Sequence, residues 1–338
     1  MRSALIVGLA GPTLQREEAV FLQQVRPAGL IIFARNVEHP DQLRRLIEDA
    51  KAALAEPDCL VMVDQEGGRV QRLREPHWTA LPAAARYGQA YRETPERALQ
   101  MLAQLSTLCA AELRDVGINT NCAPCLDLPI EGAHDVIGDR AYGHSPSDVA
   151  KFGQTVAESF MSMAVLPVIK HIPGHGRAMV DSHQRLPVVD TKWHELNDTD
   201  VAPFRSLNHL PAAMTAHIVY SDIDSNAPAT TSQTVITDVV RDKIGFDGLL
   251  MSDDLSMSAL SGAIGDRAAA VRRAGCDLVL HCNGNLTEMR AAAEHSGNLS
   301  GRSGERFQAA CAIVQKDVFP PDLPEMREQA RETLAELL

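Results

Sequence analysis

The sequence predicts an α/β protein folded as a single-domain (β/α)8 TIM barrel with a C-terminal helical tail. Eight short apolar runs alternate with amphipathic stretches along the 338 residues. These runs are almost continuously apolar, which is typical of parallel strands covered on both faces. Glycine separates many of the units, as at Gly117, Gly248 and Gly275. Eight strand–helix units in one chain fit a closed barrel.

The apolar runs set the expected strands, and the stretches between them have helical periodicity. We expect strands at residues 4–10, 29–33, 60–63, 118–123, 165–169, 212–218, 249–252 and 278–281. We expect helices at residues 14–24, 41–53, 96–116, 146–163, 200–207, 235–244 and 267–274, with tail helices near 304–318 and 326–337. One catalytic domain then covers residues 1–338, and roughly 300–338 form a helical extension packed on the barrel.

Two segments of the sequence allow more than one interpretation. Residues 4–10 resemble a weak signal peptide, but Gly11-Pro12 and charged residues follow at once, so we interpret this run as the first strand. Without it the barrel would have seven strands. Pro12 also breaks the glycine-rich turn that a doubly wound dinucleotide fold would favour. Residues 73–94 carry Trp78 and two prolines, and we expect a long, irregular but ordered excursion there.

Composition narrows the class of function. The formal net charge of −12 argues against a nucleic-acid surface. No apolar run has the length of a membrane span, so we expect a cytoplasmic protein that contacts no membrane. The odd number of cysteines, seven, suggests reduced thiols. Cys122 and Cys125 have the spacing of a redox or zinc motif, but no second pair exists, and we interpret them as packing thiols.

A barrel directs its catalytic groups outward from the carboxyl ends of its strands, so these ends test the interpretation. Every predicted strand end except the first carries polar groups, which indicates a pocket for a hydroxyl-rich ligand. These groups are Arg35 and Asn36; Asp64, Glu66 and Arg69; Asp127 and Arg140; Lys170 and His171; His217; Asp253 and Asp254; and His281 and Asn283.

The segment after the fifth strand is the most informative. Residues 170–183 read KHIPGHGRAMVDSH and place one lysine, three histidines and one aspartate around a turn. Gly174 and Gly176 predict a loop that can swing His183 in and out of the site.

These motifs resemble those of the family 3 β-N-acetylhexosaminidases, bacterial enzymes that recycle cell-wall fragments. KHIPGHG followed by DSH is the most specific combination, and the likeness runs in order from the second to the seventh strand. The matching segments are GLIIFARN (29–36), VDQEGGRVQRL (63–73), NCAPCLDL (121–128), IGDRAYG (137–143), KHIPGHG (170–176), DSH (181–183), MTAHIVY (214–220), PAT (228–230) and GLLMSDDLSM (248–257).

The resemblance implies roles for individual residues. Asp253 would be the nucleophile of a retaining glycosidase, and His183 would be the acid/base. A histidine titrates near neutral pH, and Asp181 two residues away can accept its other ring N–H and fix the tautomer. The substrate-binding residues implied are Asp64, Arg72, Arg140, Lys170 and His171.

Other residues receive weaker expectations. We expect Asp254 to be structural, His175 to hold the loop base, and Glu66 with Arg69 to form a local support network. His217 either lines the pocket or braces Asp253.

The family further implies a substrate and a setting. The substrate would be N-acetylglucosamine linked β-1,4 to an anhydro-muramoyl peptide. No cofactor, metal or nucleic-acid partner is expected, and we expect a monomer.

Several alternatives stay open at the level of sequence. His171, His175, His183 and Asp181 are ligand types of a metal-dependent hydrolase, and Lys170 could form the Schiff base of an aldolase. Asp253 and Asp254 could instead orient the substrate's acetamido group in substrate-assisted hydrolysis. Phosphate could replace water as acceptor, which would make a phosphorylase. A decayed barrel that only binds sugar is the non-enzyme alternative.

Overall fold

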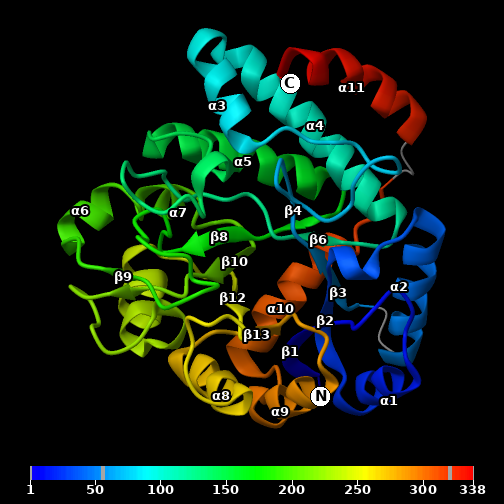
Figure 1. Ribbon diagram of the computed structural model, residues 1–338, viewed down its shortest axis with the longest axis vertical. Coiled ribbons are helices and arrows are strands. Elements are labelled where there is room, and N and C mark those ends of the chain that lie inside the picture. The colour runs from blue at the N-terminus through cyan, green and yellow to red at the C-terminus, as the bar shows by residue number, and fades with distance from the viewer. Residues whose placement is uncertain (1, 55–57, 319–321, 338) are drawn as a thin grey trace.

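The computed structural model describes residues 2–54, 58–318 and 322–337. Its centre is a ring of parallel strands surrounded by helices (Figure 1). The strand order is β7-β6-β3-β2-β1-β13-β12-β10-β8. These strands are β1 (Ser3–Gly8), β2 (Pro27–Ile32), β3 (Leu60–Val63), β6 (Thr120–Asn121), β7 (Leu166–Pro167), β8 (Ile169–Ile172), β10 (Ala212–Thr215), β12 (Leu249–Asp254) and β13 (Leu278–His281).

The nine strands form eight barrel positions. β7 and β8 lie at the two ends of the strand order, and only Val168 separates them in the chain. They are two parts of the predicted fifth strand, so the ends of the sheet meet and the ring closes. The predicted (β/α)8 fold is therefore confirmed, and each expected strand overlaps an observed one.

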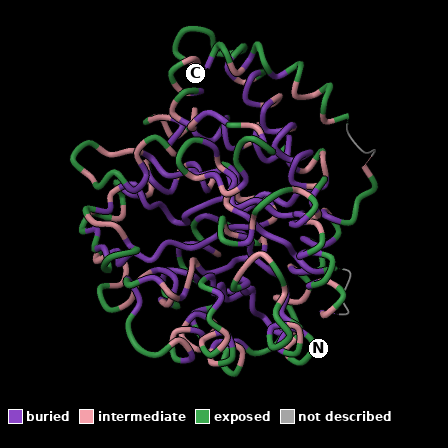
Figure 2. Tube along the Cα trace, turned by 45° about the vertical axis from the view of Figure 1, so that its right-hand side comes forward, coloured by how far each residue is buried: buried purple, intermediate pink, exposed green. Residues whose placement is uncertain are grey.

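Side chains alternate between the two faces of each strand, as the pleat requires. In β1, Leu5 and Val7 belong to the large core between strands and helices, whereas Ala4 and Ile6 belong to the core inside the ring. Both cores are fully covered, which explains why the strands read as continuous apolar runs. Figure 2 shows this buried centre.

Helices surround the ring. They are α1 (Arg16–Val25), α2 (Pro40–Leu54), α3 (Ala84–Glu93), α4 (Pro95–Asp115), α5 (Pro146–Ser162), α6 (Trp193–Asp198), α7 (Ala202–Ser206), α8 (Ile264–Ala274), α9 (Leu286–Ser296), α10 (Gly301–Val314) and α11 (Leu323–Leu337). Short 3-10 turns are η1 (Ala34–Asn36), η2 (Gly138–Arg140) and η3 (Ala229–Thr231), and η4 (Val235–Lys243) is a π-helix.

Local sequence explains several helix ends. Ser145 caps α5, where its side chain accepts from the backbone N–H of Asp148, and Pro146 takes the first turn. α8 ends at Gly275, whose φ of 110° favours glycine.

The expectation for residues 73–94 was partly wrong, because α3 occupies residues 84–93. Tyr87 of α3 is buried and joins the core. Two prolines before the helix and a helix of only 10 residues hid its periodicity. The sequence also did not predict α6, α9 or two small strand pairs, β4 (Gln65–Gly67) with β5 (Val70–Gln71) and β9 (Val188–Val189) with β11 (Val219–Tyr220).

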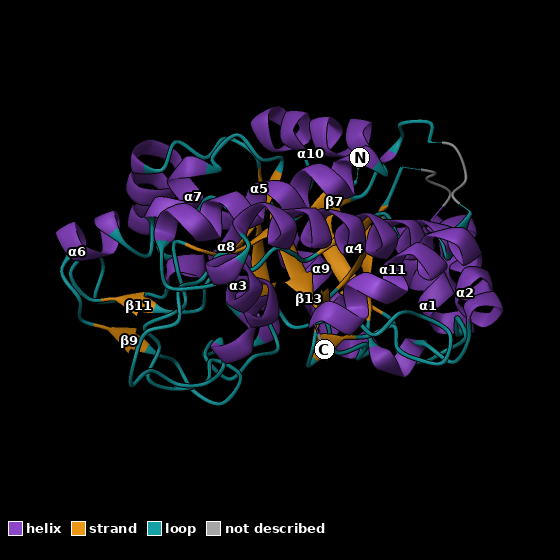
Figure 3. Cartoon of the chain, turned by 90° about the horizontal axis from the view of Figure 1, so that it is seen from above, coloured by secondary structure: helices purple, strands orange, loops and turns teal. Residues whose placement is uncertain are grey.

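The two tail helices pack differently. Phe307, Ala310, Cys311 and Val314 of α10 join the core inside the ring, so α10 closes one end of the barrel (Figure 3). α11 lies along α4 (Figure 1), where Arg327 pairs with the buried Glu112 at 2.7 Å. None of the helices in the described ranges combines the length and apolar character of a bilayer-crossing helix.

Candidate active site

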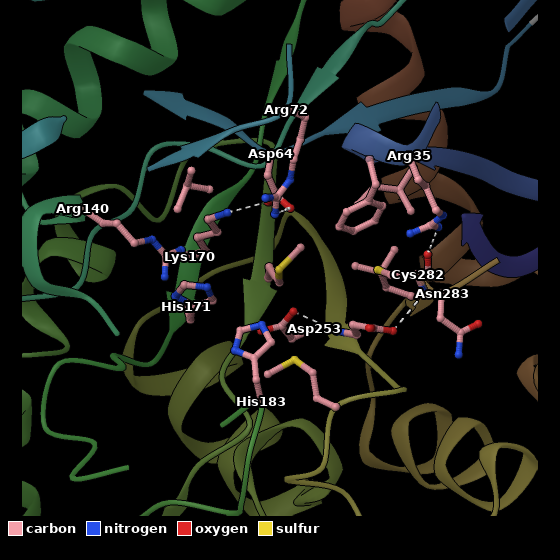
Figure 4. Close-up of a pocket in the computed structure, with 17 residues that line it drawn as sticks. Arg35, Asp64, Arg72, Arg140, Lys170, His171, His183, Asp253, Cys282 and Asn283 are labelled. Carbon is pink, nitrogen blue, oxygen red and sulfur yellow. Dashed lines mark hydrogen bonds and ion pairs between the residues drawn. The ribbon is translucent and has the colours of Figure 1, made fainter. Parts of the chain in front are cut away.

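A cavity of about 320 Å³ opens where the barrel strands end, opposite α10. It gathers side chains from the strands, or the loops that follow them, at seven of the eight barrel positions, and one of these is His183 from the loop after β8 (Figure 4). The lining residues are Ile31, Phe33, Arg35, Asp64, Val70, Arg72, Arg140, Lys170, His171, His183, Met214, Asp253, Asp254, Met257, Leu280, Cys282 and Asn283. The structure thus brings seven of the eight predicted site residues to one cavity, and the eighth, Asp181, contacts His183.

The cavity floor is apolar. Ile31, Met214 and Leu280 line it and also belong to the core inside the ring. Because that core and α10 fill the barrel below, the site is a closed pocket and not a channel.

One wall of the cavity is a chain of alternating charges. Asp64 contacts Arg72 at 3.0 Å and Lys170 at 2.8 Å. Lys170 also contacts Glu66 at 2.7 Å, and Glu66 receives two hydrogen bonds from Arg140, at 2.8 and 2.9 Å. Glu66 therefore supports the substrate-binding set directly. Arg69, by contrast, pairs with Asp139 at 2.8 Å and holds the neighbouring loop.

These contacts fix the charge of each member. Burial opposes ionisation of Asp64, but Lys170 and Arg72 hold its pKa far below the usual range. Burial likewise opposes the charge on Glu66, and Arg140 and Lys170 still lower its pKa to about 2. Although burial disfavours the ammonium, Asp64 and Glu66 raise the pKa of Lys170. Lys170 is therefore a protonated donor, which disfavours the Schiff-base alternative because that chemistry needs a free amine.

Asp127 positions His171. The Nδ1 of His171 lies 2.7 Å from Oδ2 of Asp127, whose carboxylate also accepts the backbone N–H groups of His171 and His175. Although Asp127 is fully buried, His171 lowers its pKa well below the usual value. With Nδ1 donating to Asp127, Nε2 is the ring nitrogen left for a ligand. The sequence placed Asp127 at a strand end but indicated no role for it.

Asp253 and Asp254 end β12 with different partners. Asp253 accepts only the backbone N–H of Asp254, at 2.8 Å, among the hydrogen bonds of the described chain. Asp254 accepts the N–H of Cys282 at 2.9 Å and both the N–H and hydroxyl of Ser256. Adjacent residues at a strand end are expected to point to opposite sides, yet both Asp253 and Asp254 line the cavity. The carboxylate of Asp254 is already engaged by Cys282 and Ser256.

The environment of Asp253 favours its anionic form. Burial raises the pKa of Asp253, yet the imidazoles of His217 and His171 and the N–H of Asp254 hold it below the usual value. His217 does not line the cavity. It contacts Thr230 at 2.7 Å and the carbonyl oxygen of Asp254 at 3.0 Å, so it braces the end of β12.

The loop after β8 brings an imidazole to the cavity. Nδ1 of His183 lies 2.8 Å from Oδ1 of Asp181, and the backbone N–H of His183 bonds to the same carboxylate oxygen at 2.9 Å. Although burial opposes it, these bonds lower the pKa of Asp181. The His183 side chain is 65 % exposed, and Figure 4 shows its ring turned toward Asp253.

Ser182 anchors this loop. Its hydroxyl contacts Nε2 of His175 at 3.1 Å, and its carbonyl oxygen accepts the N–H of Ala259 at 3.2 Å. Burial lowers the pKa of His175 to about 4, so this imidazole is neutral. His175 holds the loop, as expected.

Glycine is required at positions 174 and 176 for a different reason from the predicted loop motion. A Cβ at Gly176 would lie 1.7 Å from the carbonyl oxygen of Leu128, and a Cβ at Gly174 would lie 2.8 Å from the Cβ of Asp200. Gly174 also has a φ of 140°. Both positions need glycine for close packing, and motion of the loop stays a prediction.

The four metal-ligand candidates of the sequence do not converge. Across residues 2–54, 58–318 and 322–337, the group whose donor atoms lie close enough to share a cation is Cys125, Asp127 and His171. Phe33 and Cys282 also line the cavity, although the sequence indicated no role for either. The guanidinium groups of Arg35 and Arg72 lie 5.0 and 5.2 Å from the centre of the Phe33 ring.

Comparison with known proteins agrees with this geometry. Residues 5–315 match the family described as the glycosyl hydrolase family 3 N-terminal domain. A β-hexosaminidase of Bordetella avium is 39 % identical over 82 % of this chain and 80 % of its own length. A β-hexosaminidase of Methylococcus capsulatus is 39 % identical over 91 % of this chain and 92 % of its own.

Solved structures of related enzymes have the same fold as this chain. Native NagZ from Neisseria gonorrhoeae superposes with a TM-score of 0.86 at 30 % identity, over 99 % of this chain and 97 % of that one. The β-N-acetylglucosaminidase from Thermotoga maritima superposes with a TM-score of 0.77 at 28 % identity, over 93 % of this chain and 67 % of that one.

Proposed function

The chain belongs to glycosyl hydrolase family 3 and is a glycosidase, and on that premise we propose that it is a retaining exo-β-N-acetylglucosaminidase. The observation that carries the proposal is that one closed cavity holds Asp253, His183 and the charged wall together. We further propose that residues 1–338 act as one catalytic domain and that roughly 300–338 form its helical extension.

In the first step, Asp253 attacks the anomeric carbon of the terminal sugar. A bond forms between carbon and the Asp253 carboxylate, and the glycosidic bond breaks. The leaving oxygen takes a proton from Nε2 of His183, while Asp181 holds the Nδ1 proton. A low pKa keeps Asp253 anionic for this attack.

In the second step, water attacks the glycosyl-aspartate. The now neutral His183 accepts the proton of that water at Nε2, and the carboxylate of Asp253 leaves. Two inversions at the same carbon give retention of configuration. The pair of His183 and Asp181 takes the role that a second carboxylate has in most retaining glycosidases. Within this pair, Asp181 keeps the imidazole of His183 in the required tautomer.

The charged wall orients the sugar. In this proposal Asp64 accepts hydrogen bonds from sugar hydroxyls, and the donors to hydroxyl or acetamido oxygens are Arg72, Arg140, Lys170 and His171, all of which line the cavity. A cavity of about 320 Å³ with a closed floor favours one terminal sugar over a longer chain. This closure supports exo-action.

The proposed substrate is N-acetylglucosamine linked to an anhydro-muramoyl peptide, released during peptidoglycan recycling in the cytoplasm by a monomeric enzyme. The likeness to the cell-wall recycling members of the family supports this assignment. The family and its named relatives also favour it over a sugar-binding role.

The experiment compares aryl N-acetyl-β-glucosaminide with aryl β-glucoside and follows the product anomer by NMR. We expect strong preference for the N-acetyl sugar and a first-formed β product. Equal rates on both sugars would contradict the assignment, as would an α product. A parallel assay in phosphate buffer separates hydrolase from phosphorylase, because a phosphorylase would release the sugar 1-phosphate.

A further inference from the structure

We propose that Thr230 and His217 position the nucleophile: the Thr230 hydroxyl fixes one tautomer of His217, and the Nε2–H of that tautomer holds the end of β12 in place. This inference rests on the proposed role of Asp253, but it concerns two fully buried residues that do not line the cavity. They belong to the motifs MTAHIVY (214–220) and PAT (228–230), to which the proposed mechanism gives no role.

The carbonyl oxygen of Asp254 decides which ring nitrogen of His217 carries a proton. Nε2 of His217 lies 3.0 Å from that oxygen. A carbonyl oxygen only accepts hydrogen bonds, so Nε2 carries the proton. Burial lowers the pKa of His217, although Asp253 and Asp254 oppose the shift, so the ring is neutral near pH 7. Nδ1 is then a bare acceptor that needs a donor.

Thr230 supplies that donor. Its Oγ1 lies 2.7 Å from Nδ1 of His217, 2.8 Å from Oγ1 of Thr215 and 2.9 Å from the carbonyl oxygen of Ala216. The hydroxyl has one proton to give. Donation to Ala216 would leave Nδ1 either without a partner or protonated on a cationic ring, and burial disfavours both states. The proton therefore goes to Nδ1, and the hydroxyl of Thr215 donates to Thr230 in turn.

The chain of hydrogen bonds ends at the nucleophile. His217 holds the carbonyl oxygen of Asp254, and the carboxylate of Asp254 accepts the N–H of Cys282 at 2.9 Å. With both groups held, the N–H of Asp254 is directed at Oδ1 of Asp253, 2.8 Å away. Thr230 is thus a positioning residue that acts through His217.

Loss of the Thr230 hydroxyl removes the reason for this tautomer. The ring proton of His217 can then move from Nε2 to Nδ1. A bare Nε2 would face the carbonyl oxygen of Asp254, and two acceptors at that distance repel each other. The end of β12 would shift, and Asp253 would move with it.

The direct test locates the ring protons by NMR and does not depend on activity. The full chain is labelled with ¹⁵N-histidine, and the signals of His217 are assigned by their loss in H217Q or H217N, whichever folds. Near pH 7, Nε2 should have the chemical shift of a protonated nitrogen and Nδ1 that of a bare one. T230V should move the population toward the Nδ1–H tautomer, and T231V, which removes the neighbouring hydroxyl, should not. A parent ring protonated at Nδ1 would overturn the proposal, as would an unchanged ring in folded T230V.

Kinetics test the positioning itself. T230V should lower kcat on aryl N-acetyl-β-glucosaminide about five- to tenfold, the effect of one lost buried hydrogen bond, while KM changes little because Thr230 does not line the cavity. T230S keeps the hydroxyl and should retain more of kcat than T230V. Equal losses in T230V and T230S would mean that the methyl group matters and the hydroxyl does not, and the proposal would be wrong.

Failure of this inference can be told apart from failure of the proposed function. If the parent protein does not cleave the N-acetyl sugar, the proposed function is wrong, and the NMR experiment still decides whether Thr230 sets the tautomer of His217. If the sugar is cleaved but T230V has the parent kcat, the proposed function stands and the positioning role is refuted.

Discussion

The proposed mechanism needs the side chains of Asp253 and His183, and the structure constrains the first much more than the second. Asp253 ends a barrel strand, bonds to the N–H of Asp254 and lies beside His217, which is itself fixed by Thr230. His183 is mostly exposed and depends on Asp181 for its orientation. The nucleophile is thus preorganised by the barrel, and the acid/base belongs to a loop.

Replacement of His183 by alanine tests the acid role. Loss of a general acid is expected to cost about 10² to 10⁴-fold in kcat/KM on substrates with poor leaving groups. Substrates with a dinitrophenolate leaving group need no proton and should lose far less in glycosylation. Kinetics across a leaving-group series measure this difference. H209A, at an exposed histidine outside the cavity, is the matched control, and an equal loss on every substrate would contradict the role.

Replacement of Asp181 by asparagine tests its role as the hydrogen-bond partner that orients His183. The amide can offer its N–H to Nδ1 and favour the wrong tautomer, so kcat should fall about 10²-fold or more while KM changes little. Steady-state kinetics separate the two constants. A large rise in KM at unchanged kcat would instead place Asp181 in sugar binding.

The charged wall predicts a dependence of stability on pH. Glu66 has a pKa of about 2 in the folded protein against 4.5 for the free side chain. A lowered carboxyl pKa stabilises the fold fully above the unfolded value and loses that contribution as pH falls through the folded value. Removal of one partner of this buried network by E66Q should cost about 3 kcal/mol near neutral pH.

E66Q should destabilise the protein less at acidic pH than at neutral pH. The Tm difference between the parent protein and E66Q should shrink as pH falls from about 4.5 toward 2, and thermal melts across this window measure it. E294Q, at an exposed glutamate, is the control. A Tm difference that does not change with pH would contradict the account.

At the scale of elements, the loop after β8 is shaped by contacts at its base. Gly174 and Gly176 sit where other chain segments approach closely, and Ser182 is anchored by His175 and Ala259. The exposed part of the loop begins beyond this base, with Met179 at 63 % exposure. Any swing of His183 must therefore involve the residues after 178.

G176A should destabilise the protein by about 1 to 3 kcal/mol or more, because its Cβ would overlap the carbonyl oxygen of Leu128. Chemical denaturation measures the change. G143A is the matched control, since a Cβ there meets nothing within 4 Å. If both variants were equally stable, the close-packing explanation would be wrong.

Elements with an uninterrupted apolar run were predictable, and elements with an interrupted or two-residue pattern were not. β3 and β13 match their predicted ranges because buried strands read as uninterrupted apolar runs. α3 was missed because two prolines precede it and only part of one face is buried. β9 and β11 have two residues each, too few for any period to show.

At the scale of the whole molecule, closure of the ring decides which strand ends share a cavity. The sequence indicated the polar residues because they follow apolar runs, and the barrel brought them together. It could not indicate that Asp127 holds His171 or that Glu66 links Lys170 to Arg140. Those contacts join different strands, and they depend on the register between strands, which cannot be predicted from a local sequence pattern.

α11 illustrates stability supplied far from the site. Arg327 pairs with the buried Glu112, Thr333 bonds to Gln104, and no residue of α11 lines the cavity. Removal of residues 323–338 should lower Tm because it uncovers α4 and leaves Glu112 without its arginine. Below the lowered Tm, KM should stay unchanged, and a clear change in KM would show that α11 acts on the site.

The central claim is that Asp253 forms a covalent bond to the sugar, and trapping tests it most directly. Incubation with an activated, 5-fluorinated N-acetylglucosaminide should slow hydrolysis of the intermediate, and mass spectrometry of the digested protein should locate one sugar on Asp253. A label on Asp254, or an inhibited reaction that leaves no label because the acetamido group acts as nucleophile, would contradict the account.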